Sequence, residues 1–141
     1  MDLSEQIRDL NSQLTAIIRQ IAARHQLTYS QANILLTIPV EGILMSHLAE
    51  KIGIDVSTAT RNLMKLESLG LIIRSKIHKD RRKVTVTATT AGEALIDKLE
   101  IDLDEVSFSI QKMMTDEDRE KFFPVLESLN WNLTKLRADN L

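Results

Sequence analysis

Apolar residues recur with helical spacing over the first 24 positions of the chain. They alternate at steps of four and three residues, and the set consists of Leu3, Ile7, Leu10, Leu14, Ile17 and Ile21. This spacing is typical of a helix that packs along one face against another helix. The pattern predicts a helix over residues 3–24.

The next 45 residues break into shorter helical patterns. Ser30 can cap a helix that Pro39 ends at about Ile38. A second pattern covers residues 45–52 and stops at Gly53, a residue that favours the left-handed end of a helix. Two residues later Asp55 is a good N-cap for a helix that runs to about Leu69. Two helices joined by so short a turn with a glycine predict a helix-turn-helix.

A change of period from helix to strand follows. Residues 71–75 form a short run rich in β-branched side chains, residues 76–83 are basic and polar, and residues 84–88 alternate strictly. Because strands alternate with period two, this segment predicts a β-hairpin, or wing, with a basic tip.

Two longer helical patterns complete the chain. One begins at Thr89 or Thr90, where Thr90 and Glu93 have the spacing of a capping box, and the other begins near Thr115. Pro124 falls inside the last pattern, so we expect it to kink that helix or delay its start.

These elements predict a mainly α fold with one small β-hairpin: a winged helix-turn-helix flanked by terminal helices. We expect an N-terminal dimerisation helix at 1–26, a DNA-binding lobe at 27–90 and C-terminal dimerisation helices at 91–141. The terminal stripes would expose a large apolar surface in a monomer, which favours a homodimer. The residues expected at the dimer interface are Leu3, Ile7, Leu10, Leu14, Leu126, Leu129, Leu133 and Leu136.

The charge is distributed unevenly along the chain. The formal net charge is −2, but residues 30–90 hold nine basic and five acidic residues, a charge of +4, and the remainder carries −6. The middle of the chain therefore attracts phosphate. The N-terminal segment has no long apolar run, so we expect a cytoplasmic protein without a membrane partner. The absence of cysteine excludes disulfides and thiolate metal sites.

The helix that follows Asp55 has two different faces. Val56, Ala59, Leu63 and Leu66 gather on the side that we expect to be buried, opposite a polar side with two cations. A polar helix beside a basic hairpin matches the major and minor grooves of duplex DNA. The predicted DNA-binding residues are Ser57, Thr58, Thr60, Arg61 and Lys65 on the helix and Arg74, Lys76, Lys79, Arg81, Arg82 and Lys83 on the hairpin.

Other chemistry has little support in the sequence. His25, His47 and His78 are too scattered to predict a metal site, and no phosphate-binding loop or nucleophile motif is present. We therefore expect no enzyme activity, cofactor or metal.

Two segments resemble the multiple antibiotic resistance regulator (MarR) family. The stretch DRRKVTVTATTAG is similar to the family's wing-to-helix motif, with Asp80, Arg82, Thr89 and Gly92 at the matching positions and Ala88 where leucine is usual. Upstream, LAEKIGIDVSTATRNLMKLESLGLI is similar to the family's helix-turn-helix.

The resemblance implies a homodimeric transcriptional regulator that reads double-stranded DNA at a pseudo-palindromic operator. It implies that Arg82 enters the minor groove and that Asp80 orders the wing turn. It also implies a ligand-responsive repressor with a small-molecule effector, whose identity the sequence leaves open. The alternative is a winged-helix module for protein–protein interaction, since a fold does not dictate a function.

Overall fold

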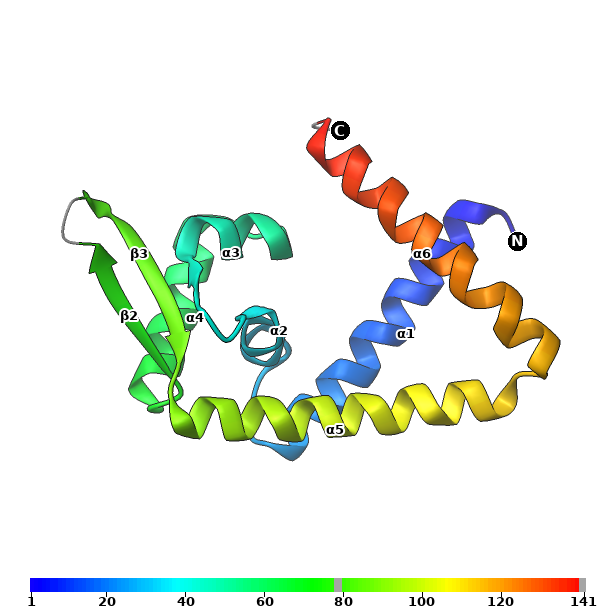
Figure 1. Cartoon of the computed structure of the whole chain (residues 1–141), viewed down its shortest axis with the longest axis horizontal. Coiled ribbons are helices and arrows are strands. Elements are labelled where there is room, and N and C mark those ends of the chain that lie inside the picture. Colours follow the sequence, from blue (N-terminus) through cyan, green and yellow to red (C-terminus); the bar gives the residue numbers. More distant parts are fainter. Residues whose placement is uncertain (78–79, 140–141) are drawn as a thin grey trace. The chain divides into compact units, whose positions relative to one another are not determined.

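The computed structural model describes residues 1–77 and 80–139, without the side chains of Ile77 and of residues 80–82. The helices are α1 (Leu3–Arg24), α2 (Tyr29–Thr37), α3 (Met45–Ile52), α4 (Val56–Ser68), α5 (Thr90–Met113) and α6 (Asp116–Ala138). The strands are β1 (Ile43–Leu44), β2 (Ile72–Ile77) and β3 (Asp80–Ala88) (Figure 1). The predicted fold class, mainly α with a β-hairpin wing, is confirmed. By their internal contacts the residues form two units, 1–103 and 104–141, whose boundary falls inside α5.

The strands form an antiparallel sheet in the order β1-β3-β2. Strands β2 and β3 are paired from Ile72 opposite Ala88 to Lys76 opposite Val84, and the register shifts after Lys76. The prediction that residues 76–83 form a polar tip was wrong in part, because most of them belong to the two strands. Strand β1 was not predicted, since two residues are too few to show an alternating pattern.

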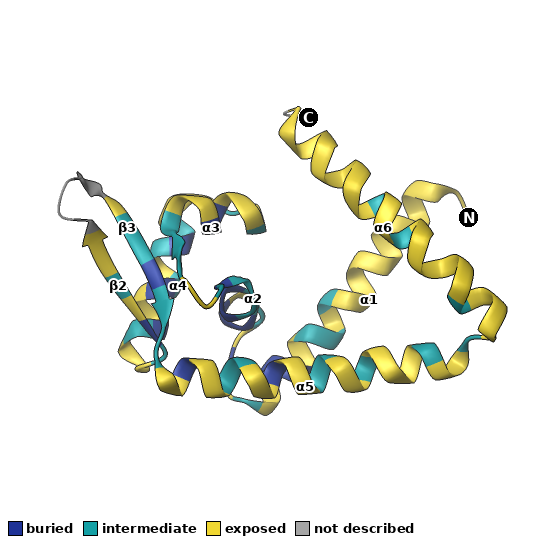
Figure 2. Ribbon diagram, viewed as in Figure 1, coloured by how far each residue is buried: buried dark blue, intermediate teal, exposed yellow. Residues whose placement is uncertain are grey.

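The hydrophobic core lies in the unit of residues 1–103 and draws on the end of α1 and on every element from α2 to α5 except the short β1 (Figure 2). Its largest fully buried side chains are Ile34, Leu35, Leu48, Leu63, Leu66, Ile72, Val86 and Leu99. Burying a Leu, Ile or Val side chain stabilises a fold by roughly 1.5–3 kcal/mol. Because α4, β2 and β3 contribute to the same core, the core holds the helix and the hairpin together.

Side-chain caps define most helix starts. Thr28, and not Ser30 as predicted, caps α2, because Thr28 and Gln31 form a capping box. Helix α5 begins at Thr90 as expected, but the amide of Gly92 donates to the hydroxyl of Thr89 over 3.0 Å, so the predicted Thr90–Glu93 capping box was wrong. Thr115 caps α6, and the helix continues through Pro124, which therefore does not delay its start.

A close contact joins the end of α4 to the start of α5. The Thr89 hydroxyl donates to the carbonyl of Gly70 over 2.6 Å, and the Thr89 amide donates to the carbonyl of Leu71 over 3.0 Å. A Cβ atom on Gly92 would lie 1.9 Å from that Leu71 carbonyl oxygen. Only glycine permits this approach, so Thr89 and Gly92 hold α4, β2 and α5 together at one point.

We predict that Gly92→Ala destabilises the protein. An alanine in place of a helical glycine ordinarily adds about 0.4–1 kcal/mol of stability, but overpacking costs typically about 1–3 kcal/mol and the contact here is with backbone. The measurement is the free energy of unfolding by urea. Ala91→Gly, at an exposed neighbouring position, is the matched control and should lose about 1 kcal/mol through helix propensity alone. A more stable Gly92→Ala variant would contradict the packing argument.

Candidate nucleic-acid interface

Helix α4 has a buried face and an exposed face, as its sequence pattern predicts. Ala59, Leu63 and Leu66 are fully buried, whereas Ser57 and Arg61 are exposed. Lys65 and Ser68 continue the exposed face along the helix. The helix thus offers small hydroxyls and two cations to a partner.

Val56 departs from the prediction that it lies in the core. The residue is 50% exposed. The neighbouring residues Asp55 and Ser57 are exposed as well, whereas Ala59, later in the same turn of α4, is fully buried. Helical periodicity places Val56 near the apolar face but contains no signal for where the neighbouring elements end.

A chain of hydrogen bonds links the cap of α4 to Arg61. The carboxylate of Asp55 accepts from the Thr58 amide over 2.7 Å and from the Thr58 hydroxyl over 3.0 Å. These bonds, the amide first, and the nearby Arg61 charge hold the pKa of Asp55 below its usual value. The Thr58 oxygen in turn accepts from the Arg61 guanidinium over 3.4 Å. Arg61 is therefore orientated before any ligand binds.

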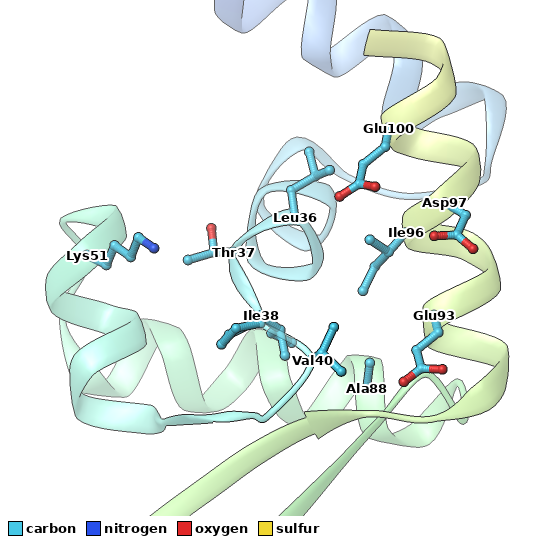
Figure 3. Close-up of a pocket in the computed structure, with 11 residues that line it drawn as sticks. Leu36, Thr37, Ile38, Val40, Lys51, Ala88, Glu93, Ile96, Asp97 and Glu100 are labelled. Carbon is cyan, nitrogen blue, oxygen red and sulfur yellow. The ribbon is translucent and has the colours of Figure 1, made fainter. Parts of the chain in front are cut away.

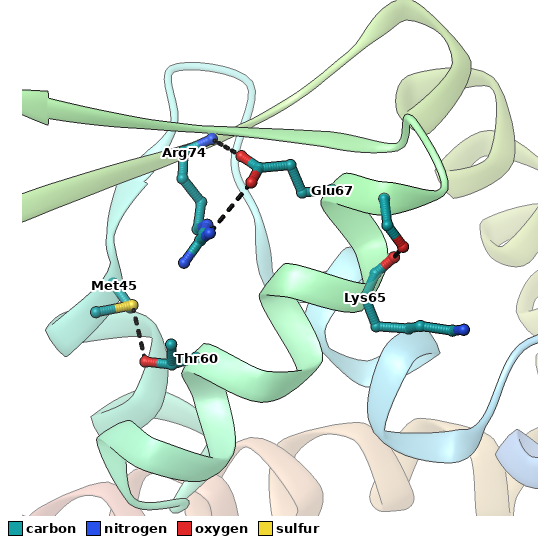
Figure 4. A network of polar contacts seen from close by, with 6 residues as sticks. Met45, Thr60, Lys65, Glu67 and Arg74 are labelled. Carbon is teal, nitrogen blue, oxygen red and sulfur yellow. Dashed lines mark hydrogen bonds and ion pairs between the residues drawn. The ribbon is translucent and has the colours of Figure 1, made fainter.

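The other predicted helix residues differ in how freely their polar groups face solvent. The half-buried Thr60 donates its hydroxyl to the Val56 carbonyl over 2.8 Å and also contacts the Met45 sulfur (Figure 4). Lys65 is exposed, and its carbonyl accepts from the Ser68 hydroxyl over 2.6 Å. The structure thus brings Ser57, Arg61 and Lys65 to one exposed face and turns the Thr60 hydroxyl toward its own backbone.

Arg74 has a partner within the protein. Its guanidinium donates to the Glu67 carboxylate over 3.1 Å, and its backbone amide donates to the second oxygen of that carboxylate over 3.0 Å (Figure 4). The Arg74 side chain is only 26% exposed, and its Nε is buried without an acceptor. This pair ties β2 to α4. Because Glu67 lies in α4 and Arg74 in β2, no single periodicity relates the two residues, so the sequence carried no signal for the pair.

The remaining basic residues lie on the hairpin beyond this pair. Lys76 and Lys83 are exposed on β2 and β3. Lys79 lies outside the described residues, and so do the side chains of Asp80, Arg81 and Arg82. The DNA contacts expected for these residues, and the ordering role expected for Asp80, stay predictions.

An open groove lies beside this lobe, within residues 36–100. Its volume is about 550 Å³. Leu36, Ile38 and Ile96 supply apolar surface, and α5 contributes three carboxylates, those of Glu93, Asp97 and Glu100 (Figure 3). Lys51 of α3 lies on the opposite side of the groove. The groove therefore combines an apolar floor with an acidic wall.

Three other observations bear on function. His25 is bound to Asp102 of α5 over 2.8 Å, which gives this histidine a structural partner. Among the described residues no group of three or more His, Asp or Glu side chains could hold a metal ion. None of the described helices combines the length and apolarity that crossing a membrane requires.

Residues 27–84, which include α2, α3, α4 and β2, match the model of the MarR family. The chain carries a MarR family domain. It is 31% identical over 83 residues to the HTH-type transcriptional regulator TtmR of Methylorubrum extorquens (strain PA1), a match that covers 58% of this chain and 43% of TtmR. The chain thus matches less than half the length of this relative.

Solved structures of MarR proteins share the fold over nearly the whole chain. A MarR transcriptional regulator from Methanosarcina mazei superposes with a TM-score of 0.82 at 23% identity, covering 95% of this chain and 97% of that one. MepR of S. aureus, solved in complex with DNA, superposes with a TM-score of 0.78 at 20% identity, covering 94% and 99%. At these identities the likeness establishes the winged-helix fold of the MarR domain and its flanking helices.

We predict that Glu67→Gln destabilises the MarR domain near neutral pH and has little effect in acid. The Arg74 side chain, followed by the Arg74 amide, lowers the pKa of Glu67 from its usual 4.5. A carboxylate with a lowered pKa stabilises the fold above its unfolded pKa, and this stabilisation is lost as the pH falls through the folded pKa.

The midpoint of urea unfolding, compared at pH 7 and about pH 3.5, measures this difference. We expect the wild-type advantage at pH 7 to shrink in acid. Glu127→Gln removes an exposed carboxylate from α6 and serves as the control, with no such change. If Glu67→Gln lowers the urea midpoint equally at both pH values, the stabilisation by Glu67 comes from packing and not from its charge.

Proposed function

We propose that this protein is a transcriptional regulator that binds double-stranded DNA sequence-specifically as a homodimer. The observation that carries the proposal is the exposed face of α4, with Ser57, Arg61 and Lys65, beside a basic hairpin. The segment around them has a charge of +4 in a chain of net charge −2. A lobe that is basic in an otherwise acidic protein fits a polyanionic partner.

Each part of the lobe has a distinct task in this proposal. Helix α4 enters the major groove, where Arg61 reads a base edge and Lys65, one turn later, contacts phosphate. The hairpin follows the backbone to the minor groove, where Arg82 is held by a turn that Asp80 orders. Because Arg74 is engaged with Glu67, it acts as a strut between α4 and the hairpin.

The terminal helices support a homodimer. In the single chain α1 exposes Leu3, Leu10 and Leu14, and α6 exposes Leu133 and Leu136. Ile7 is also exposed, while Leu126 and Leu129 are half-buried. Apolar stripes of this kind favour burial against a second copy, and a two-fold dimer reads a pseudo-palindromic operator.

Selection of bound duplexes from a random library tests DNA binding. We expect one preferred site whose affinity falls steeply with salt. On that site Arg61→Ala should cost about 1–3 kcal/mol and relax sequence preference, whereas Lys65→Ala should weaken specific and random DNA alike. If Arg61→Ala weakens binding to the selected duplex and to random DNA by the same factor, Arg61 contacts only phosphate.

A paired variant tests the dimer in the same experiment. Leu10→Glu with Leu14→Glu places two charges on the α1 stripe and should give monomers in sedimentation equilibrium with weak DNA binding. Asp9→Lys, on the exposed surface of α1, is the control and should stay dimeric. No selected duplex at any salt concentration would favour the alternative, a module for protein interaction. A monomeric wild-type protein would overturn the dimer.

We also propose that an effector, which weakens DNA binding, occupies the groove between α2 and α5. The three carboxylates of Glu93, Asp97 and Glu100 and the apolar floor of Leu36 and Ile38 favour a cation with an apolar body over an anion. The groove adjoins the start of α5, which Thr89 and Gly92 connect to α4.

Two small probes of opposite charge test this effector site. Tetraphenylphosphonium should raise the Kd for the selected duplex, and benzoate should not. The Asp97→Asn, Glu100→Gln variant should retain DNA binding and lose the response to tetraphenylphosphonium. An equal response in this variant, or a response to benzoate alone, would remove the groove as the effector site.

A further inference from the structure

We infer that Val56 is a specificity residue of the interface and packs against the 5-methyl group of a thymine in the major groove. The inference rests on the proposed DNA binding. Its basis is an exposed apolar side chain at the first residue of a helix whose other exposed residues at this end are polar.

The position of Val56 suits a base contact. It opens α4, directly before Ser57 and one and a half turns before Arg61. The N-terminal residues of a recognition helix are those that reach the base edges when the helix lies in the major groove. Val56 lies five residues before Arg61, about 140° away around α4 at 100° per residue, and so does not share the face of Arg61. It reaches the groove through its place at the N-terminal end of the helix, the end that approaches the base edges.

The local structure also keeps Val56 in place. Asp55 caps the helix through the Thr58 amide, and the Val56 carbonyl accepts from the Thr60 hydroxyl over 2.8 Å. A valine in a helix adopts one main rotamer, so its methyl groups lose little freedom on binding. The hydrogen bond from the Thr60 hydroxyl to the Val56 carbonyl helps to hold the backbone at Val56 in place.

The chemistry of Val56 selects one base of the four. The side chain offers no hydrogen bond, and it leaves half of its surface exposed to water in the free protein. Among unmodified bases only thymine presents a methyl group in the major groove. Contact between the two apolar groups removes both from water, whereas any other base leaves a polar edge facing the valine without a partner.

A second apolar residue on α4 provides a matched control. Met64 is 54% exposed, close to the value for Val56, but it lies two turns further along the helix. It is also a flexible, unbranched side chain. If exposed apolar surface on α4 were merely nonspecific, truncation of either residue would have the same effect.

Uracil substitution in the selected duplex tests the inference, because uracil lacks only the methyl group of thymine. We expect one thymine per half-site whose replacement weakens wild-type binding about fourfold. For Val56→Ala the same replacement should have no effect, and binding to the thymine duplex should fall by a similar factor. Met64→Ala should retain the wild-type response at that thymine.

The outcomes separate this inference from the proposed function. If no thymine responds to uracil in the wild type, or if Val56→Ala still responds as the wild type does, the assignment of Val56 is overturned while DNA binding stands. Loss of the response in Met64→Ala but not in Val56→Ala would transfer the role to Met64. If the library yields no bound duplex, the failure is that of the proposed function itself.

Discussion

The arrangement of the lobe depends on the close approach between Gly92 and the Leu71 carbonyl. At this point the chain has just left α4, is about to form β2, and returns from β3 into α5. Thr89 satisfies the Gly70 carbonyl with its hydroxyl and the Leu71 carbonyl with its amide. A side chain at position 92 would separate these segments. The angle between α4 and the hairpin is thus set by backbone contact, which interiors packed at crystal density do not easily deform.

A second tie, the pair of Glu67 and Arg74, also joins α4 to β2. Together the two ties make α4 and β2 a rigid pair, which suits an interface that must match the fixed geometry of two grooves. The cost is a partly buried arginine with an unpaired Nε. The cost is consistent with a role for Arg74 in positioning α4 against β2, and not in contacting a ligand.

The distribution of charge follows the same division of labour. Basic residues gather on α4 and the hairpin, whereas three acidic residues of α5, Glu93, Asp97 and Glu100, line a groove. Carboxylates beside DNA would weaken DNA binding, but in the groove they create a region that attracts cations. One domain can therefore attract a polyanion on one face and a cation on another, with Thr89 and Gly92 between them.

The sequence by itself determined the parts that depend on local pattern. The bounds of α1 and α3, the Asp55 cap and the buried residues Ala59, Leu63 and Leu66 were predicted from periodicity and capping, because these rules act within a few residues. The Thr89 and Gly92 positions were identified by resemblance, although their physical reason came only from the fold.

Tertiary structure decided what depends on residues distant in sequence. Strand β1 exists because β3 supplies partners for two residues that have no strand pattern of their own. Arg74 is turned inward because the fold brings Glu67 to it. Val56 is exposed although Ala59 in the same turn of α4 is buried, because periodicity assigns a residue to a side of a helix but does not say how far its neighbours extend along it.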